Sequence, residues 1–193
     1  MIIAKDDASV AFDRCGAHAQ PRFDHLRLSA VRIVILGAAG SGKSTLARRL
    51  GKKLDLPVVC LDDIWQPSWG ASDVPAFREL VRGAHAGEAW ISDGNFAAAT
   101  FDIRLPRATL ILWLECHRRV SAWRAFVRVL DPESGHRLRK LPRVLRYIRN
   151  FDRINRPLIE KLRLEHGAQI PVRHLVDSRD VERFFADATW NSQ

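Results

Sequence analysis

Apolar and polar residues form alternating blocks along most of the chain, and the blocks have the lengths of strands and helices. Five short runs are rich in β-branched and other apolar residues, which is typical of buried parallel strands. These runs cover residues 31–36, 57–61, 89–92, 108–115 and 172–176. Between them, apolar residues recur at helical spacing over residues 42–54, 76–86 and 179–188. The alternation predicts an α/β protein with a parallel sheet and right-handed crossovers.

The beginning of the chain lacks this pattern. Residues 1–28 mix charged and polar residues with proline and show no sustained period, so we expect a loosely ordered extension. Residues 29–193 hold the periodic blocks, and we expect them to form one domain. The chain has no apolar run near the ~18 residues of a membrane span and no basic region followed by an apolar one. We therefore expect a cytoplasmic protein without a membrane partner.

Charge adds a second feature to this picture. The 193 residues are 47% hydrophobic and 27% charged, which are ordinary globular values, and the formal net charge is +9. Residues 117–163 alone carry 14 Lys and Arg against 4 Asp and Glu, whereas the rest of the chain is nearly neutral. The three cysteines include no C-x-x-C pair, so the sequence indicates neither a disulfide framework nor a zinc site. A functional interpretation must explain the basic segment.

A phosphate-binding motif follows the first strand. Residues 37–44 fit the pattern G-x-x-x-x-G-K-[ST] with a strand before and a helix after, which is the context that supports the motif. Glycines allow backbone N–H groups to surround a phosphate, Lys43 can reach β- and γ-phosphates, and Ser44 can ligate Mg²⁺. A glycine-rich turn with an incidental Lys-Ser pair is the less favoured alternative. The predicted nucleotide-binding residues are Gly37, Ala38, Ala39, Gly40, Ser41, Gly42, Lys43, Ser44 and Thr45.

Acidic residues end the next two strands, where ligands bind in open α/β sheets. Asp62 and Asp63 follow the second strand, and Asp93 ends the third, two residues before Asn95. Such carboxylates can hold Mg²⁺ through water or accept the proton of an attacking hydroxyl. The alternatives are a helix cap or a simple turn. We predict metal-ligand roles for Asp62 and Asp93, and acceptor contacts for Asp63, Trp65, Asp93 and Asn95.

Arginines gather after the fourth strand. Arg124 and Arg128 are four residues apart and so share one helix face, and Arg156 lies on a later helical segment. Arginines around a transferring phosphoryl group neutralise its charge, and one such arginine can change the rate by ~10³–10⁵. A solvated basic face is the usual alternative, and most of the arginines must belong to it. A few of them are candidates for catalysis.

Four sequence segments together resemble a known family. They are LDDIWQPSW at 61–69, WISDGN at 90–95, WRAFVR at 123–128 and NRPL at 155–158. With the phosphate motif, residues 31–186 resemble the adenylate kinase-like branch of the P-loop kinases, closest to a subfamily labelled topology modulation protein. The resemblance implies a three-layer P-loop fold with a five-stranded parallel sheet of order 2-3-1-4-5.

The resemblance also implies roles for single residues. Arg124 and Arg128 would lie near the adenine and the phosphates, Arg156 would be a second phosphate-side arginine, and Asp62 would be the base. Monophosphate kinases carry Pro-Arg where this chain has other residues after Asn95, so Arg104 is the candidate that holds an acceptor phosphate. The basic segment at about 129–156 would be the lid, with residues 131–142 as its moving part.

These features predict an enzyme that binds ATP and Mg²⁺ and transfers the γ-phosphoryl group to a small nucleotide or nucleoside-like acceptor. Its predicted catalytic residues are Lys43, Asp62, Arg124, Arg128 and Arg156. Two alternatives remain: a nucleotide-dependent nucleic-acid-binding protein, and an NTP hydrolase without a specific acceptor. The first would use the basic segment and its interleaved aromatic residues to stack bases. Those aromatic residues, which fit packing on the core equally well, are Trp123, Phe126, Tyr147 and Phe151.

Overall fold

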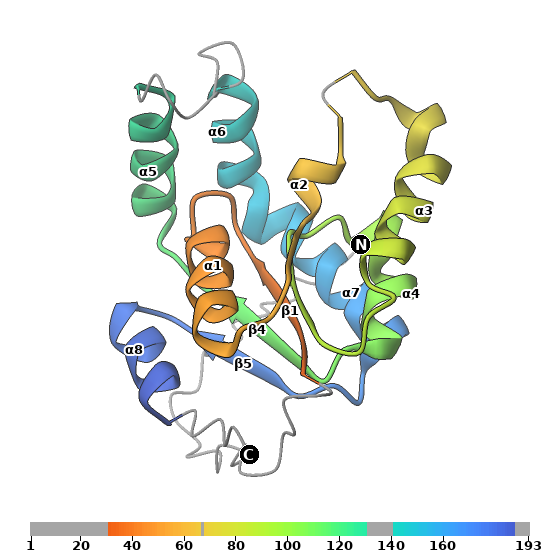
Figure 1. The fold of residues 1–193 in the computed structure, drawn as a ribbon. Helices are drawn as coiled ribbons and strands as arrows, with labels where there is room; N and C mark the ends of the chain where they lie inside the picture. The colour runs from red at the N-terminus through yellow and green to blue at the C-terminus, as the bar shows by residue number, and fades with distance from the viewer. Residues whose placement is uncertain (1–30, 67, 131–140, 188–193) are drawn as a thin grey trace, which may run out of the picture.

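A five-stranded parallel sheet forms the centre of the protein (Figure 1). The computed structural model describes residues 31–66, 68–130 and 141–187. The strands are β1 (Arg32–Gly37), β2 (Val58–Cys60), β3 (Trp90–Asp93), β4 (Leu110–Leu114) and β5 (Val172–Leu175). Their order is β2-β3-β1-β4-β5, which confirms the predicted fold class and order. The expected extension at 1–28 and most of the candidate lid lie outside the described residues.

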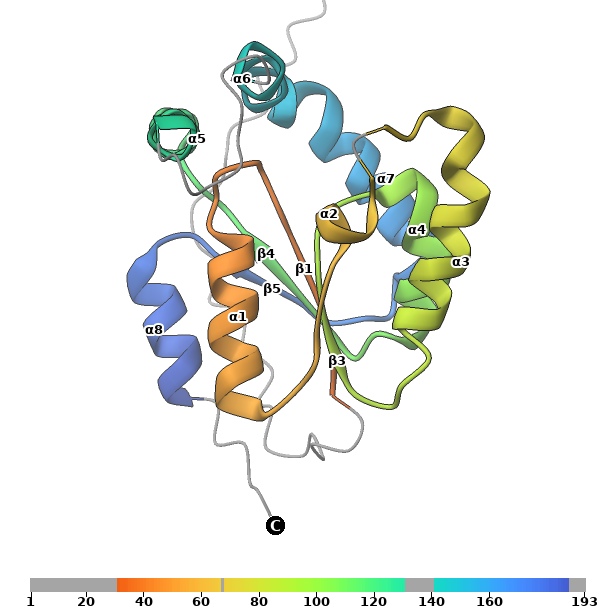
Figure 2. The same ribbon diagram turned by 45° about the horizontal axis from the view of Figure 1, so that its top comes forward.

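Helices cover both faces of the sheet. They are α1 (Lys43–Leu54), α2 (Leu61–Ile64), α3 (Val74–Ala84), α4 (Ala97–Arg104), α5 (Arg118–Leu130), α6 (Leu141–Asn150), α7 (Arg156–Gly167) and α8 (Ser178–Asp187). Short 3₁₀ turns span Ala71–Asp73 and Leu105–Arg107, and a π-helical turn at Phe151–Asn155 joins α6 to α7. Helices α1 and α8 lie on one face, and α4 and α7 on the other (Figure 2).

The side chains of β1 point alternately to the two faces of the sheet, and each face has its own apolar core. Ile33 and Ile35 point to the α1 and α8 side, whereas Val34 and Leu36 point to the α4 and α7 side, and all four are fully buried. A strand that is buried on both faces needs an apolar residue at every position, and this is the pattern that the sequence showed. Burial on both faces therefore holds β1 firmly in the sheet. The phosphate motif continues from the carboxyl end of this strand.

Two further features position the site. Helices α5 and α6 lie side by side at the carboxyl end of the sheet, so much of the basic segment stands over the phosphate motif (Figures 1 and 2). A third apolar cluster, separate from the two main cores, lies between α2, α3 and α4 around Leu61, Phe77 and Val81.

In the part of the chain that the structure describes, no helix has the length and apolar character needed to cross a membrane.

Candidate active site

The phosphate motif forms a tight loop between β1 and α1. Gly37 has φ +145° and Gly40 has φ +77°, conformations that L side chains rarely adopt. A Cβ atom on Gly40 would stand 2.5 Å from the carbonyl oxygen of Ser121, and one on Gly37 would stand 2.4 Å from that of Leu114. The glycines are therefore required both by the backbone path and by the close approach of β4 and α5.

The remaining motif residues lie around the start of α1. Lys43 Nζ donates to the carbonyl oxygen of Ala38 at 2.8 Å, across the mouth of the loop. Helix α1 begins after Gly42 with no side-chain cap, which leaves its first N–H groups available to an anion. Ser44 and Thr45 follow in the first turn of α1. The loop geometry agrees with the sequence prediction, whereas its ligand stays a prediction.

Helix α5 brings an arginine to the same loop. Arg124 Nη1 lies 3.3 Å from the carbonyl oxygen of Ser41 and 4.0 Å from Cys116 Sγ. The guanidinium group is exposed and borders Gly42 as well. The predicted proximity of Arg124 to the phosphate site thus has a structural basis. Arg128 lies on the same helix, but its side chain is outside the part of the chain that the structure describes.

Asp93 is buried at the carboxyl end of β3. The residue is 3% exposed, and its Oδ1 atom has no hydrogen-bond partner. It pairs in register with Ile35 of β1 on one side and with Cys60 of β2 on the other. Burial raises the pKa of the Cys60 thiol to about 11, and the nearby charge of Asp93 contributes to the same shift. A buried carboxylate oxygen without a partner fits the water shell of a hard cation.

The described residues hold no cluster of three or more His, Cys, Asp or Glu side chains that would bind a metal alone. A cation bound here would therefore depend on phosphate oxygens and water, which is how Mg²⁺ is usually held beside nucleotides. The predicted metal ligands Ser44 and Asp93 lie on adjacent elements, α1 and β3, at one edge of the sheet. Their chemistry fits Mg²⁺.

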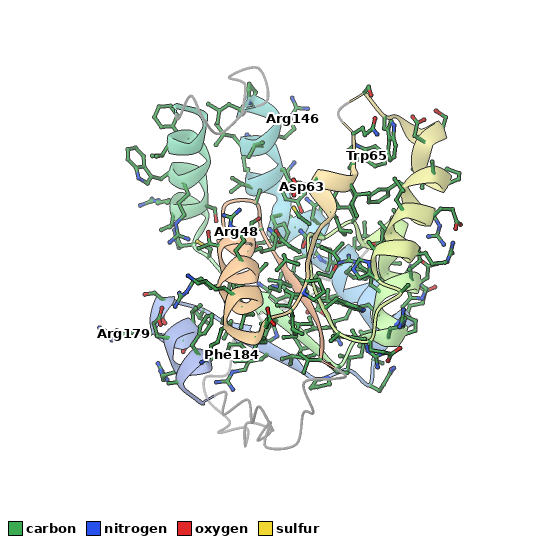
Figure 3. All side chains as sticks on the ribbon, viewed as in Figure 1. Arg48, Asp63, Trp65, Arg146, Arg179 and Phe184 are labelled. Atoms are coloured by element: carbon green, nitrogen blue, oxygen red, sulfur yellow. The ribbon has the colours of Figure 1, made fainter. Side chains whose placement is uncertain are left out.

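Helix α2 places two carboxylates beside α6. Asp62 and Asp63 are exposed in this four-residue helix. Burial raises the pKa of the Tyr147 phenol on α6, and the charge of Asp62 raises it further, so Asp62 lies close to this hydroxyl. Asp63 and Trp65 come from the α2 end, and Arg146 comes from α6, at the same end of the molecule (Figure 3).

The side chain of Asn95 connects the phosphate loop with α6. Its Oδ1 accepts from the N–H of Gly37 at 3.2 Å, and its Nδ2 donates to the carbonyl oxygen of the same glycine at 2.9 Å. Nδ2 also donates to the Tyr147 hydroxyl at 2.9 Å. The sequence predicted an acceptor contact for Asn95, but in the structure its amide holds protein groups. It positions the start of the loop.

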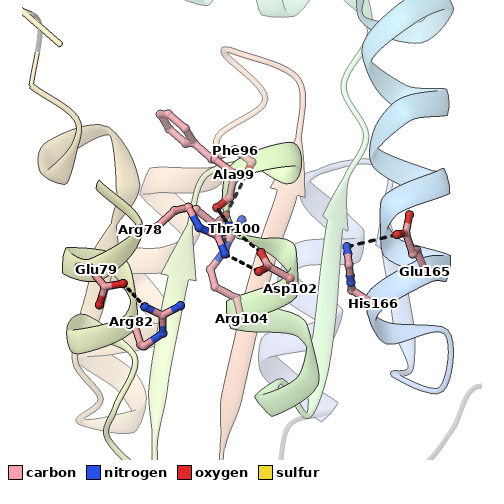
Figure 4. Close-up of polar contacts among 10 residues, drawn as sticks. All are labelled: Arg78, Glu79, Arg82, Phe96, Ala99, Thr100, Asp102, Arg104, Glu165 and His166. Carbon is pink, nitrogen blue, oxygen red and sulfur yellow. Dashed lines mark hydrogen bonds and ion pairs between the residues drawn. The ribbon is translucent and has the colours of Figure 1, made fainter. Parts of the chain in front are cut away.

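Arg104 differs most from its predicted role. The side chain is fully buried, and it donates to Thr100 Oγ1 at 3.0 Å (Figure 4). It also donates to Ser92 Oγ and to the carbonyl oxygens of Gly94 and Asn95 at 2.5–3.1 Å. Burial lowers its pKa to about 9, although the charge of Asp93 opposes this shift. A guanidinium group with these four acceptors and no exposed surface does not support the predicted grip on an acceptor phosphate. It holds the turn after β3.

A buried histidine completes this network, and no sequence motif had pointed to it. His85 is 1% exposed; its Nδ1 donates to the carbonyl oxygen of Val81 at 2.7 Å, and its Nε2 accepts from Ser92 Oγ at 2.8 Å. The carbonyl can only accept, so the ring carries its proton on Nδ1. Burial lowers the pKa of His85 to about 4. The chain His85–Ser92–Arg104 therefore supports the turn that carries Asn95.

Arg156 lies in an ion pair at the carboxyl end of β4. Its Nη2 is 2.7 Å from Glu115 Oε1, which also accepts from His174 Nδ1 at 2.9 Å. The guanidinium group stands 5.5 Å from the Trp113 ring centroid. The hydrogen bond from His174 lowers the pKa of Glu115 to about 2 against the effect of burial, with a further contribution from Arg156. The structure shows Arg156 bound to a carboxylate of the protein, and its catalytic role stays a prediction.

Comparison with known proteins agrees with this fold. Shikimate kinase from Acinetobacter baumannii in complex with shikimate has a TM-score of 0.53 and 13% identity, covering 82% of this chain and 93% of that chain. A gluconokinase from Sinorhizobium meliloti 1021 (TM-score 0.49, 15% identity, 82% and 89% covered) is also similar. So is shikimate kinase from Bacteroides thetaiotaomicron (TM-score 0.48, 22% identity, 79% and 93% covered).

The first of these likenesses, at its low identity, shows the fold alone: this chain shares the three-layer architecture of that shikimate kinase, with helices on both faces of a five-stranded parallel sheet. No family model and no curated protein matches the sequence. The resemblance to the topology modulation subfamily is therefore unconfirmed and stays a prediction.

Proposed function

We propose that this protein is an ATP- and Mg²⁺-dependent phosphotransferase that phosphorylates a hydroxyl group of a small-molecule acceptor. The observation that carries the proposal is the convergence of three groups at the carboxyl edge of the sheet. They are the phosphate loop, the Arg124 guanidinium against Ser41, and the buried Asp93 oxygen that has no partner. Phosphoryl transfer depends mainly on positioning and on neutralising charge, and these groups supply both.

Each residue then has a defined task. Lys43 exchanges the Ala38 carbonyl for the β- and γ-phosphates, and Arg124 neutralises charge on the transferring group. Ser44 and Asp93 would hold Mg²⁺, which when bound neutralises phosphate charge. Asp62 orients the acceptor hydroxyl and takes its proton as the new O–P bond forms and the bond between the γ-phosphorus and ADP breaks.

The direct test replaces Lys43 by alanine. We expect phosphoryl transfer to fall by about 100-fold or more, because one charged donor to the transition state is lost. Lys52→Ala, an exposed lysine of the same helix, is the matched control and should retain activity. A Lys43→Ala enzyme with full transfer activity would refute the proposal. Release of free phosphate that no nucleoside, nucleotide or small alcohol diverts would favour the hydrolase alternative.

One observation favours the nucleic-acid alternative as a second candidate. Trp123 is 65% exposed and Phe126 is 40% exposed on the basic helix α5, with ring centroids 6.0 Å apart. Phe151, in contrast, is buried in the core, and Tyr147 packs partly against it. Two open rings beside arginines are suited to base stacking. A salt titration with single-stranded oligonucleotides tests this candidate: binding that depends on ATP and on Trp123 supports it, and weak binding that ignores both counts against it.

A further inference from the structure

Charge divides the two sides of the candidate site. The described part of the basic segment at 117–163 includes α5 and α6, whereas residues 61–107, which include α2, α3 and α4, carry four arginines against seven carboxylates. In a P-loop fold whose nucleotide phosphates lie on the loop after β1, the carboxyl ends of β2 and β3 are left for the acceptor. The acceptor side is therefore acidic, and its cations are four arginines.

Two of its four arginines are held by carboxylates of the protein. Arg78 donates to both oxygens of Asp102, at 3.0 and 2.6 Å, and to the carbonyl oxygen of Ala99 at 2.6 Å (Figure 4). The Arg78 contacts lower the pKa of Asp102. Arg82 is paired with Glu79 one turn earlier on α3. A bidentate arginine–carboxylate pair of this kind is strong and oriented, so an incoming anion would have to displace it.

The other two are held mainly by backbone carbonyls, although Arg107 Nη2 also lies 3.9 Å from Glu88 Oε1. Arg104 is buried in the turn after β3, as described above. Arg107 donates to the carbonyl oxygens of three consecutive residues that follow α3, His85, Ala86 and Gly87. Every cation among the described residues of 61–107 is thus engaged by the protein itself. Under the proposed function, the exposed arginines of α5 and α6 would serve ATP, a polyanion whose charge several of them would neutralise.

The same side presents aromatic rings. Trp65 packs edge-on against Trp69 at 5.7 Å and against Phe77 at 5.1 Å, and it lies 6.1 Å from Phe96. Phe77 is fully buried, whereas Trp65, Trp69 and Phe96 are only half-buried, so parts of their rings remain open. We call these four residues the aromatic wall. Phe96 is held in the left-handed region at φ +34°, directly after Asn95.

Carboxylates adjoin this wall. Asp62 and Asp63 precede Trp65 with only Ile64 between, and both carboxylates are exposed. Asp93, on the strand next to β2, is nine-tenths buried or more and has the oxygen without a hydrogen-bond partner. The acceptor side therefore combines open aromatic surface with negative charge and an unsatisfied acceptor oxygen, and its cations are already engaged.

Resting on the proposed function, we infer that the acceptor is an uncharged or cationic alcohol with a flat or largely apolar ring, and not one that carries a carboxylate or phosphate. The aromatic wall would stack the ring, and the carboxylates would accept its hydroxyl or amine protons. An anionic acceptor would meet the like charge of Asp62 and Asp63, and the arginines of residues 61–107 are already engaged by the protein. We expect this to lower kcat/KM by at least about 10-fold.

Matched pairs of acceptors test the inference. Adenosine and adenosine 5′-monophosphate, uridine and uridine 5′-monophosphate, and glucitol and gluconate each differ mainly in one anionic group, and shikimate adds an anionic ring. With ATP and Mg²⁺ in excess, the neutral member of at least one ring-bearing pair should accept phosphate at least about 10-fold better in kcat/KM. If the anionic members are the better acceptors, the inference fails and the proposed function stands. If neither kind accepts phosphate, both fail.

Variants of the wall separate its role from folding. Trp65→Ala should raise the acceptor KM by about 10-fold or more and leave the ATP KM unchanged, whereas Trp65→Phe should restore much of the loss. Leu80→Ala, an exposed residue of α3, is the control for the same region. Asp63→Asn should reduce the preference for the neutral acceptor. An unchanged acceptor KM in Trp65→Ala, or an unchanged preference in Asp63→Asn, would overturn the assignment.

Discussion

Replacing Asn95 by alanine should loosen the start of the phosphate loop. The substitution removes three hydrogen bonds, two to the backbone of Gly37 and one to the Tyr147 hydroxyl. Gly37 is buried, so its N–H and carbonyl groups would lose partners that water does not easily replace. Each unsatisfied buried group costs about 1–3 kcal/mol, and the Tyr147 bond contributes about 1 kcal/mol. We expect a total loss of about 3–7 kcal/mol, a large part of an ordinary domain's stability.

Urea unfolding of four proteins measures this contact. They are the wild type, Asn95→Ala, Tyr147→Phe and the double variant. Tyr147→Phe keeps the ring and removes only the hydroxyl, so we expect it to cost about 1 kcal/mol. Because both single variants remove the same bond, the double variant should be less destabilised than their sum by about 1 kcal/mol.

Two results would refute this reasoning. One is an Asn95→Ala protein destabilised by less than about 1 kcal/mol, which would mean that the Gly37 groups find other partners. The second is strict additivity of the two substitutions, which would mean that the side chains are not in contact. ATP binding gives an independent readout: Asn95→Ala should weaken it more than Tyr147→Phe, because only Asn95 touches the loop.

Two further predictions concern stability and the loop. His85 has a pKa of about 4 in the folded protein, below its ordinary value of 6.5, so the unfolded chain binds the proton first as the pH falls. Stability should be constant above about pH 6.5 and should fall between pH 6.5 and 4 by at most about 3 kcal/mol. In urea unfolding at several pH values, His85→Gln should lose much less stability between pH 6.5 and 4 than the wild type. If the stability of both proteins falls equally with pH, His85 is not the cause. Gly40→Ala should abolish nucleotide binding in a calorimetric titration, because its Cβ would meet the Ser121 carbonyl oxygen. Gly83→Ala is the matched control: its Cβ would enter open space on α3, and it should stabilise the protein by about 0.5–1 kcal/mol. Normal ATP affinity in Gly40→Ala would show that the loop adapts.

The sequence predicted the strands well because each is a short apolar run with a clear end. The five observed strands fall within the predicted ranges to within one residue, and Trp90 and Trp113 are core residues of β3 and β4. The helix α4 was missed, since its segment mixes small, polar and apolar residues and lacks a long apolar stripe. The four-residue α2 is too short to show any period.

The candidate site was predictable where a motif determines the backbone conformation. It was less predictable where a polar side chain has several possible hydrogen-bond partners. The loop at 37–44 and the approach of Arg124 agree with the sequence prediction. Arg104 and Asn95 do not, because a sequence does not tell whether a polar side chain turns toward a ligand or toward a nearby carbonyl. Arg104 finds four protein acceptors in β3, α4 and the turn between them, and the position of its side chain depends on α4, which the sequence pattern did not reveal.

In the turn after β3, neighbouring residues contact the phosphate loop on one side and form part of the aromatic wall on the other. Asn95 ties it to the phosphate loop, Phe96 belongs to the aromatic wall, and Arg104 holds the carbonyls of Gly94 and Asn95. A change of ring size at Phe96, which would be the simplest route to a new acceptor, would also displace the anchor of the ATP loop. New acceptor specificity in this protein should therefore evolve more readily at Trp65 and Trp69 than at Phe96. Laboratory selection for altered acceptors should show the same bias.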